Sequence, residues 1–325
     1  MSIARSIAEL LNEAEQAVAE GRAYGAKTWA TGFSPLDVQL GGGLRAGELI
    51  LVGGAQGLGK TTFALQIARN VAASGHHALY LCYEHREQEL LERLLAMELG
   101  LHGGDEAMTL TGLRRLSASR SGSSLRERFG ATDGASAALA TIEQYGGRLR
   151  LATLSGSGTG LDAVRSAVSS TLEQPGVVVV DYLQKVRVKG DLTNEDERVT
   201  LIAEGLKDLA LESDLPLVAI AAADKLGVSG GRTQLHHLRG STALSYEADV
   251  ALLLNDKINV VAKHHLLYGT ANAEMFRRWL VCSIEKNRSG GSSVDLEFEK
   301  HLDHGHFDPA GRHVAEQLTS DRLHE

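Results

Sequence analysis

The sequence contains little cysteine and few aromatic residues. Only two cysteines, Cys82 and Cys282, occur in 325 residues, and each lies in a short apolar run. Two isolated cysteines provide neither a disulfide framework nor the ligand spacing of a zinc site, so a reducing cytoplasm is the expected location. Aromatic residues make up 5% of the chain, whereas glycine occurs 36 times. This balance suits a loop-rich α/β protein.

Positive charge is also scarce, and long apolar runs are absent from the sequence. The formal net charge is −8, whereas a protein whose main role is to coat nucleic acid is usually basic. Any contact with nucleic acid must therefore use a local patch. The N-terminus lacks the apolar region of a signal peptide, and no stretch approaches the roughly 18 apolar residues of a membrane span. We expect a cytoplasmic protein with no membrane partner.

An amphipathic helix is predicted near the start of the chain, over residues 2–21. Its apolar residues recur at helical spacing, and its glutamates lie elsewhere on its surface. Glycines at positions 21 and 25 end the pattern, so residues 1–27 form a linker or oligomerisation segment. The apolar stripe needs a surface that covers it. This surface is provided either by the chain's own domain or by a neighbouring subunit, and the sequence leaves both alternatives open.

Strand-like runs alternate with helical patterns over residues 28–310. The runs lie at 48–54, 78–84, 148–154, 177–184, 216–223, 249–255, 278–288 and 293–300. The central ones are continuous and β-branched, as in parallel strands that are covered on both faces. Helices separate the earlier runs but not the last ones. We therefore predict one α/β domain with a mostly parallel twisted sheet, helices on both faces and an antiparallel end, followed by a C-terminal tail at 311–325.

Two segments depart from this alternation. Residues 100–147 are rich in Gly, Ser and Arg, and are predicted to form an irregular helical insert with a mobile loop. His301, His304 and His306 match no familiar set of metal ligands, so they are interpreted as part of a polar surface loop.

A phosphate-binding loop is predicted between the first central strand and the following helix. Residues 54–61, "GAQGLGKT", match the pattern G-x-x-x-x-G-K-S/T. Its glycines let successive backbone N–H groups and a helix N-terminus face one anion. Lys60 would reach the β- and γ-phosphates of ATP, and the Thr61 hydroxyl would hold Mg²⁺. The predicted nucleotide-binding residues are Gly54, Gln56, Gly57, Gly59, Lys60, Thr61 and Thr62.

Two acidic residues at strand ends are the candidate partners of this loop, because ligands bind at the carboxyl ends of parallel strands. Asp181 ends the run "VVVV", where a carboxylate is costly unless it orders Mg²⁺ and its water. Glu84 ends "ALYLCY" and is positioned to act on the attacking water. The alternatives are a helix-capping Asp181 and a surface Glu84.

The motifs together resemble the ATPase domain of the DnaB-type replicative helicases, a branch of the RecA-like ring motors. The resemblance rests on "TGFSPLDVQLGGGLRAGELILVGGAQGLGKTTFALQIARNVA", "LCYEHREQELLERLLAMELG", "DYLQ" at 181–184, "LRGSTALSYEADVALLL" and "EKNRSGG", which follow in family order. "LGGGL" and "KNR" also occur in the RadA and KaiC branches. The resemblance implies a RecA-like P-loop NTPase fold.

The resemblance also implies roles for individual residues. Glu84 resembles the catalytic glutamate and Asp181 the Mg²⁺-ordering aspartate. Lys286 and Arg288 resemble the finger pair that reaches the γ-phosphate bound by the adjacent subunit; a solvated basic strand end is the alternative. Fingers that act in trans imply a ring, most simply a hexamer, and the N-terminal helix then resembles the linker helix that packs on a neighbour.

The chain departs from the family where nucleotide and DNA would be coupled. Ala222 stands where the family carries a Gln that senses the γ-phosphate, unless Asp224 or Lys225 replaces it, and Gly240 stands where an acidic residue is usual. Residues 257–276 are longer than the usual connection. The segments expected to form central DNA loops carry basic residues but no aromatic residue that could stack on bases. The candidate phosphate contacts are Arg187, Lys189, Lys225 and Arg232.

Three functions are consistent with these features. The first is a ring-forming ATPase motor on single-stranded DNA, with a protein loader or effector as a further partner. The second is a RadA- or KaiC-like ATPase with a recombination or regulatory role and no helicase activity. The third is a binding module whose ATP-dependent ring assembles other proteins. "DYLQ", the linker helix and the finger pair favour the first, whereas Ala222 and the acidic charge favour the others.

Overall fold

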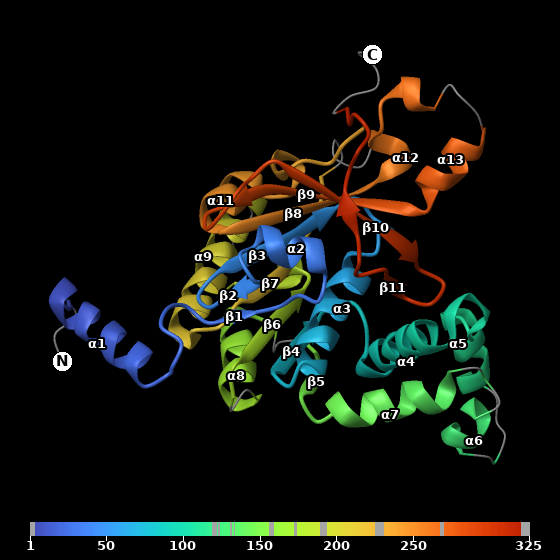
Figure 1. Cartoon of the computed structure of the whole chain (residues 1–325), viewed down its shortest axis with the longest axis horizontal. Helices are drawn as coiled ribbons and strands as arrows, with labels where there is room; N and C mark the ends of the chain where they lie inside the picture. Colours follow the sequence, from blue (N-terminus) through green and yellow to red (C-terminus); the bar gives the residue numbers. More distant parts are fainter. Residues whose placement is uncertain are drawn as a thin grey trace.

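A ten-stranded sheet forms the centre of the molecule (Figure 1). The structure is a computed structural model that describes residues 4–118, 122, 124–130, 132, 134–155, 159–171, 174–188, 194–224, 231–266 and 270–319. The strand order is β11-β10-β9-β8-β3-β7-β6-β4-β5, and β12 pairs with β10. The strands are β3 (Leu49–Gly54), β4 (His77–Cys82), β5 (Leu149–Thr153), β6 (Gly176–Asp181), β7 (Leu217–Ala222), β8 (Val250–Asp256), β9 (Trp279–Asn287), β10 (Val294–His301), β11 (His306–Phe307) and β12 (Arg312–His313).

The strand directions confirm the predicted mostly parallel sheet with an antiparallel end. The strands from β8 to β5 pair in parallel, whereas β9 pairs antiparallel with both β8 and β10. Every residue of β3 and β6 is buried. Their continuous apolar runs require cover on both faces of the sheet. A short antiparallel pair, β1 (Thr28–Trp29) with β2 (Leu44–Arg45), lies outside the main sheet.

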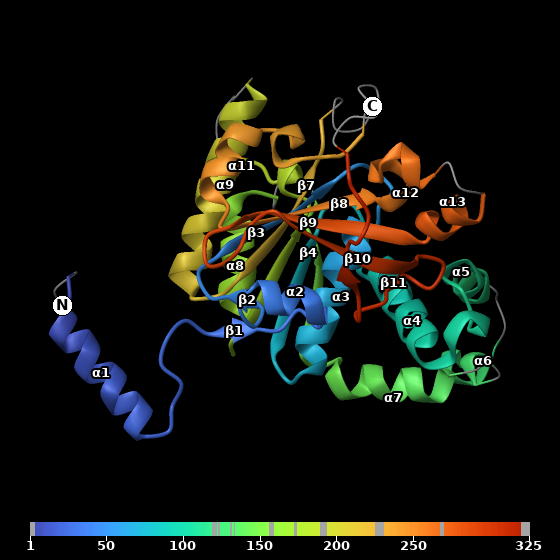
Figure 2. The same cartoon turned by 45° about the horizontal axis from the view of Figure 1, so that its top comes forward.

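Two groups of helices provide that cover on opposite faces of the sheet (Figures 1 and 2). One group contains α3 (Lys60–Ala73), α4 (Glu87–Gly103) and α7 (Ala135–Tyr145), and the other contains α8 (Leu161–Thr171), α9 (Glu195–Ser213) and α11 (Ser241–Glu247). Beside α3, the short helix α2 (Ser34–Gln39) follows Phe33, whose ring stacks on that of Phe63 with centroids 4.6 Å apart. This aromatic contact joins the segment before α2 to α3, the helix that follows the glycine-rich loop.

Helix α1 (Ile7–Ala19) lies away from the sheet and its helices (Figures 1 and 2). Ser6 caps it, with its side chain accepting from the Glu9 N–H group. Ile7 is 84% exposed, Leu11 57% and Val18 66%. The chain's own domain therefore leaves this apolar stripe uncovered.

The insert between α4 and α7 contains more regular structure than its composition suggests. It contains a 3-10 turn (Gly104–Glu106), α5 (Leu110–Ala118) and α6 (Leu125–Phe129). Leu113 and Phe129 bury their side chains with Leu95 and Leu99 of α4 in a second, smaller core. Apolar residues spaced along these short helices outweigh the loop-favouring Gly and Ser residues.

The C-terminal segment belongs to the domain up to residue 319, which differs from the predicted tail. It adds β12 to β10 and lies against α12 (Lys257–Val260), where the Thr319 N–H group donates to the Val260 carbonyl at 2.7 Å. Lys257 is fully buried and forms ion pairs with Glu297 and with Glu316, the latter at 2.6 Å. A buried ammonium must be paired, so the segment that carries Glu316 is held in place. The remainder of residues 257–276 adds a 3-10 turn (Lys263–His265) and α13 (Thr270–Arg277).

The interpretation of the histidine-rich segment as a polar surface loop is wrong. His304 and His306 are 6% and 7% exposed, and both pack against Gly100 of α4. The His304 Nε2 atom lies 3.0 Å from the Ala107 carbonyl oxygen, and the His301 and His306 rings stack. Burial lowers the pKa of His306 to about 4, so this imidazole is neutral at pH 7. The hairpin buries these rings because a glycine of α4 leaves room for them.

No helix in the described part of the chain has the length and apolar character needed to cross a bilayer.

Candidate nucleotide site

A cavity of about 700 Å³ lies at the carboxyl end of β3, where the strand turns into α3. Nine of the predicted residues line it: Gly54, Gln56, Gly57, Gly59, Lys60, Thr61, Thr62, Glu84 and Asp181. Two glycines are required by the turn. Gly59 caps α3 with a φ of 83°, and a Cβ on Gly54, whose φ is 149°, would lie 2.6 Å from the Leu254 carbonyl oxygen. Both the backbone conformation and the close neighbour exclude larger residues there.

Lys60 folds back over the glycine-rich loop. Its Nζ atom donates to the Gly54 carbonyl at 2.9 Å and to the Ala55 carbonyl at 2.7 Å. Burial lowers the pKa of the Lys60 ammonium, while the negative charges of Asp181 and Glu84 oppose this shift. The ammonium is thus held by neutral carbonyl groups beside the N-terminus of α3. An anion at that N-terminus would supply the charge partner that the carbonyl groups do not.

Asp181 and Thr61 present adjoining oxygen atoms to the cavity. The Thr61 hydroxyl donates to Asp181 Oδ2 at 2.9 Å, and the Tyr80 hydroxyl donates to the same oxygen at 2.8 Å. Asp181 is 1% exposed, and burial raises the pKa of its carboxyl group against the opposing effect of these hydrogen bonds. A buried carboxylate beside a hydroxyl fits Mg²⁺, which prefers oxygen ligands and keeps several of its waters. A cation here would also offset the cost of burying the charge.

Glu84 reaches the same cavity from the neighbouring strand. Strands β4 and β6 are parallel, and Cys82 is in register with Asp181. Glu84 follows two residues later, where its exposed side chain lines the cavity. The parallel register therefore accounts for the proximity of two carboxylates that are far apart in the sequence. Its arrangement suits a base that acts on water near a phosphate.

The cavity also contains residues that the sequence analysis missed, among them Arg93 on α4 and Leu302 after β10. The Nε atom of Arg93 is buried and has no hydrogen-bond partner among the described residues. Tyr80 was missed as well, although it supports Asp181. The period of two along β4 could have identified it, because Tyr80 faces the same side of the strand as Cys82, which is in register with Asp181.

Ala222 lies at the end of β7 and lines the cavity with a side chain that has no polar atom. The side chain of Gln184, from "DYLQ", connects the end of β7 to the backbone at Arg239. The Ala222 N–H group donates to Gln184 Oε1 at 3.1 Å, and Gln184 Nε2 donates to the Arg239 carbonyl at 3.3 Å. Asp224, one of the two predicted substitutes for the missing Gln, also lines the cavity, whereas Lys225 lies outside the described residues.

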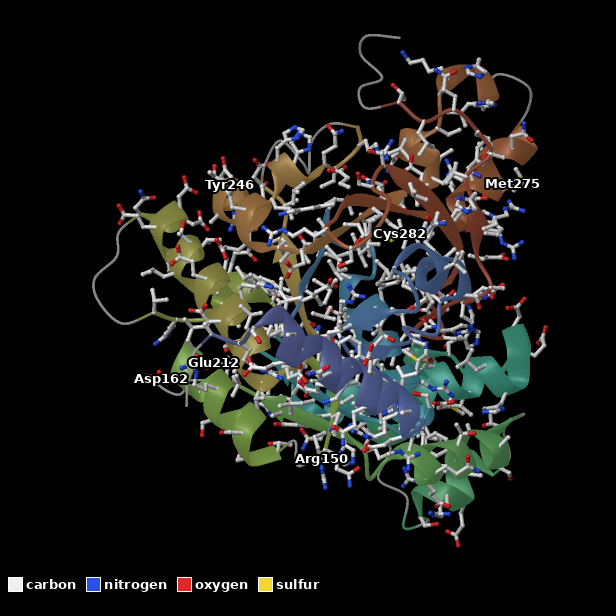
Figure 3. The ribbon with its side chains drawn as sticks, turned by 60° about the vertical axis from the view of Figure 1, so that its left-hand side comes forward. Arg150, Asp162, Glu212, Tyr246, Met275 and Cys282 are labelled. Carbon is white, nitrogen blue, oxygen red and sulfur yellow. The ribbon has the colours of Figure 1, made fainter. Side chains whose placement is uncertain are left out.

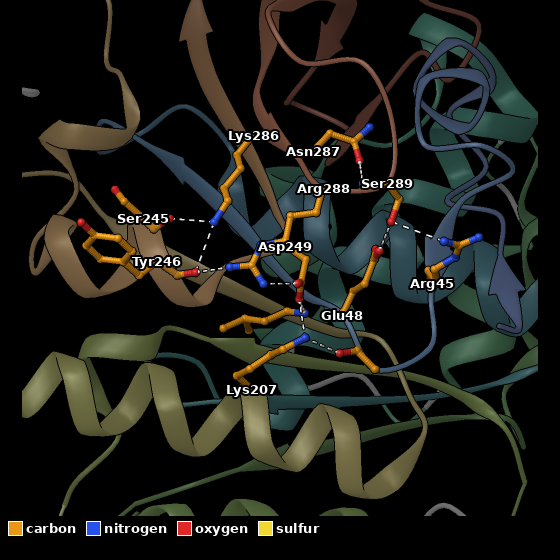
Figure 4. A network of polar contacts seen from close by, with 12 residues as sticks. Arg45, Glu48, Lys207, Ser245, Tyr246, Asp249, Lys286, Asn287, Arg288 and Ser289 are labelled. Carbon is orange, nitrogen blue, oxygen red and sulfur yellow. Dashed lines mark hydrogen bonds and ion pairs between the residues drawn. The ribbon is translucent and has the colours of Figure 1, made fainter. Parts of the chain in front are cut away.

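Lys286 and Arg288, drawn in Figure 4, lie at the end of the sheet that the strand pairing places away from the cavity. Because β9 runs antiparallel to β8, its carboxyl end lies beside Val250, and Val250 pairs with Ile50 at the start of β3. The six residues of β3, about 20 Å of strand, separate the pair from the cavity of the same chain. Neither side chain can reach it.

Contacts within the chain hold these two cations side by side. Lys286 Nζ donates to the Ser245 carbonyl at 2.7 Å and to the Tyr246 carbonyl at 3.3 Å, and Arg288 Nη2 donates to the Tyr246 carbonyl at 2.5 Å. Tyr246 itself is on the surface of α11 with 71% of its area exposed (Figure 3). Partial burial lowers the pKa of Lys286, and the positive charge of Arg288 lowers it further.

The predicted DNA contacts are less uniform in the structure. Arg187 is exposed beside the loop after β6, whereas Lys189 lies outside the described residues. Arg232 is 16% exposed, forms an ion pair with Asp295 and donates to the Ser283 hydroxyl at 2.9 Å. Its guanidinium is therefore engaged within its own domain, and its contact with DNA stays a prediction.

Comparisons with known proteins find relatives over most of the chain. The model of the DnaB-like helicase C-terminal domain family matches residues 29–306. The chain is 29% identical over 230 residues to the replicative DNA helicase DnaB of Treponema pallidum, covering 70% of this chain and 47% of that protein. It is 26% identical to the protein of the same name from Mycoplasma pneumoniae, covering 83% and 54%. The chain spans about half the length of these curated relatives.

Solved structures support the fold. One solved ATPase domain superposes with a TM-score of 0.72 at 20% identity, covering 94% of this chain and 99% of that domain. A DnaB-like replicative helicase superposes with a TM-score of 0.69 at 19% identity, covering 94% of this chain and 67% of that one. At this identity the likeness concerns the fold, and it confirms the predicted RecA-like arrangement.

Proposed function

Since this chain belongs to the DnaB-like helicase C-terminal domain family, we propose that it is a ring-forming ATP hydrolase that acts on single-stranded DNA, most simply as a hexamer in the cytoplasm. The observation that carries the proposal is the separation of the cavity from Lys286 and Arg288. Each chain carries the cavity at one end of its sheet and the Lys286–Arg288 pair at the other, and each of these is half of the proposed site. A head-to-tail interface joins unlike halves, and it closes into a ring when the rotation between subunits permits.

Each cavity residue then has a chemical role. Lys60 and the backbone of Gly54, Gly57 and Gly59 would bind the phosphates of ATP, and Thr61 and Asp181 would hold Mg²⁺, an ion that supplies neutralising charge for phosphoryl transfer. Glu84 accepts a proton from the attacking water. The neighbour's Lys286 and Arg288 supply positive charge to the γ-phosphate, where charge develops in the transition state.

Helix α1 supports the ring. Its exposed Ile7, Leu11 and Val18 form an apolar stripe that the chain's own domain leaves uncovered. Docking of this stripe on the adjacent subunit would bury it and set the spacing between the two half-sites. About 25 cal/mol is gained for each Å² of apolar surface removed from water, so a stripe of this kind contributes usefully to association.

A positive channel is required for the DNA step. Arg187, Lys189 and Arg232 from each subunit would form a basic ring despite the net charge of −8. Binding should then tolerate any base sequence, need ATP-dependent assembly and weaken steeply with salt. The test is polarisation of a labelled single strand with a non-hydrolysable ATP analogue at several salt concentrations. An assembled ring that leaves the strand free at low salt would contradict the DNA function.

The second candidate is a RadA- or KaiC-like ATPase without helicase activity, and Ala222 is the observation that favours it. A methyl group at the end of β7 cannot hydrogen-bond to a γ-phosphate. The two functions are separated by the ATPase rate with single-stranded DNA, with RNA and with no polymer. Stimulation by DNA alone supports the first, whereas a rate that no polymer changes supports the second.

The shared site has its own test, which needs no DNA. Arg288→Ala subunits keep an intact cavity, and Lys60→Ala subunits keep intact fingers. We expect each variant alone to lose about 10³-fold in turnover. Mixed rings isolated through two affinity tags should recover about a quarter of wild-type turnover, because half of the interfaces have an intact cavity and half of those face an intact finger. No recovery in verified mixed rings would exclude a site shared between subunits.

A further inference from the structure

Asp249 holds the finger residue Arg288 through both its side chain and its backbone (Figure 4). Its Oδ1 atom accepts from Arg288 Nη1 at 3.1 Å, and its carbonyl accepts from the Arg288 backbone N–H group at 2.9 Å. The second contact continues the β8–β9 ladder by one residue beyond Asn287. Asp249 therefore fixes both the backbone position of Arg288 and the orientation of its guanidinium group.

The other oxygen of Asp249 is anchored in the body of the domain. Oδ2 accepts from the Leu49 N–H group and from Lys207 Nζ, each at 2.8 Å. Lys207 also donates to the Gly47 carbonyl at 2.8 Å. The side chain of Asp249 is 7% exposed, whereas that of Arg288 is 51% exposed. A buried, fully paired carboxylate thus orients a guanidinium whose outer part faces solvent.

This arrangement leaves Arg288 able to bind a further anion. A guanidinium has five N–H donors in a rigid fork. One contact to Asp249 and one to the Tyr246 carbonyl occupy Nη1 and Nη2, so donors remain for a phosphate. Leu49, which Asp249 holds, is also the first residue of β3, the strand that ends at Gly54 in the cavity. The finger of each subunit is therefore fixed to the strand that carries its own phosphate-binding loop.

We propose that Asp249 is the positioning residue of the finger: it orients Arg288 toward the ATP bound by the adjacent subunit and ties that finger to the amino end of β3. The inference rests on the proposed function, because it assumes that Arg288 acts in trans. Lys207 balances the charge of Asp249 without touching Arg288 in the described contacts. Asp249, which orients Arg288, can therefore be distinguished by experiment from Lys207, which only balances the charge of Asp249.

The test uses Asp249→Asn in the full-length chain. We expect a loss of about 100-fold in turnover, the order of effect that a misplaced catalytic group causes. Affinity for a fluorescent ADP analogue should stay within about twofold of wild type, because the cavity lies at the other end of β3. Lys207→Met is the matched variant: it should destabilise the domain to a similar degree but keep most of the turnover. Asp214→Asn, at an exposed ion pair with Lys27, is the control for the chemical change.

Mixed rings assign Asp249 to one half of the site. Asp249→Asn subunits mixed with Lys60→Ala subunits should recover turnover, because the second partner supplies an intact finger. Asp249→Asn mixed with Arg288→Ala should recover none, since neither partner supplies one. A residue that merely stabilises the fold would not show this selectivity.

The outcomes separate the two proposals. Failure of Arg288→Ala and Lys60→Ala to complement one another overturns the shared site. If they do complement one another, but Asp249→Asn fails to recover with Lys60→Ala or keeps wild-type turnover alone, the positioning role is overturned. Should Asp249→Asn fail to fold, Asp249→Glu retains the charge with an altered reach. It should show a smaller loss of turnover and the same pattern of complementation.

Discussion

The two ends of β3 differ in how their charged groups are satisfied. At the carboxyl end, the Lys60 ammonium donates to two carbonyl groups, and Asp181 accepts from two hydroxyl groups. At the amino end, Asp249 accepts from Lys207, Arg288 and the Leu49 N–H group. The carboxyl end is arranged for a charged ligand, whereas the carboxylate at the amino end is already paired with two cations.

Strand direction explains this difference. The parallel strands bring their carboxyl ends, and the loops that follow them, to one edge of the sheet. The added strand β9 runs in the opposite direction, so its carboxyl end brings Lys286 and Arg288 to the other edge. One reversed strand therefore separates these two cations from the cavity of the same chain.

The greatest losses should come from changes at the carboxyl end alone. Lys60→Ala should abolish nucleotide binding, because Lys60 contacts phosphate in the ground state. Glu84→Gln should keep binding and lose about 10³-fold in turnover, because Glu84 acts on water near the transition state. Binding of a fluorescent ATP analogue and the steady-state ATPase rate measure the two effects. Glu84→Gln protein that hydrolyses ATP at the wild-type rate would contradict the role of Glu84.

The next largest loss of turnover should come from removing the contact between subunits, which separates the cavity of one subunit from Lys286 and Arg288 of the next. Deletion of residues 1–25 should convert a closed ring into monomers or short open forms, as measured by light scattering. Turnover should fall by about 100-fold or more because the finger then rarely meets a neighbouring cavity, while ADP affinity is retained. Glu15→Gln, a change on the polar side of α1, serves as the control. A ring that persists after the deletion would show that α1 is dispensable for assembly.

A more modest change tests the role of the carboxyl end in DNA coupling. Ala222→Gln places an amide beside Gln184 and the cavity, and should raise the stimulation of turnover by single-stranded DNA by about threefold, the order expected of one added hydrogen bond. The ratio of ATPase rates with and without DNA measures this. Ala137→Gln, on the exposed side of α7, controls for the new side chain. An unchanged ratio would mean that Asp224 or another group already couples the two sites.

The least pronounced effect concerns the stability of the carboxyl end. Burial raises the folded-state pKa of Asp181 above its unfolded value, so the ionised carboxylate destabilises the ligand-free fold once the pH exceeds that raised pKa. Asp181→Asn should therefore increase the free energy of unfolding at pH 7 by about 1 kcal/mol while abolishing turnover.

The pH dependence of this variant supplies the check. The gain should shrink as the pH falls, because wild-type Asp181 then becomes protonated and loses its unfavourable charge. Urea titrations at pH 7 and pH 5 without nucleotide measure the difference. A variant that is less stable than wild type at both values would show that the carboxylate is favourable in the ligand-free fold.

The residues that follow local rules could be identified from the sequence. The glycine-rich loop, the apolar runs of β3 and β6, and the acidic residues at strand ends were all apparent in it, because each reflects the conformation of a few neighbouring residues. Parallel pairing also predicts that Glu84 and Asp181 lie at one edge of the sheet, and both line the cavity there.

Other features depended on contacts between distant segments. Burial of His304 against Gly100 and inclusion of residues 311–319 in the domain arise from packing partners far away in the sequence. The same holds for Arg232, a predicted DNA contact whose guanidinium pairs with Asp295. Composition marks these residues as polar and exposed, but a polar side chain can be buried wherever a distant segment supplies its hydrogen bonds and charge.

The order of the amino acids was enough to predict the groups of each half of the proposed site: a phosphate-binding loop, two carboxylates and two cations spaced for one side of a strand. Folding in three dimensions was needed to place these halves at opposite ends of one sheet and to join the finger to β3 through Asp249. The physical reason is that residue spacing controls local conformation, whereas the direction in which a late strand joins a sheet depends on hydrogen bonds and packing across the whole domain.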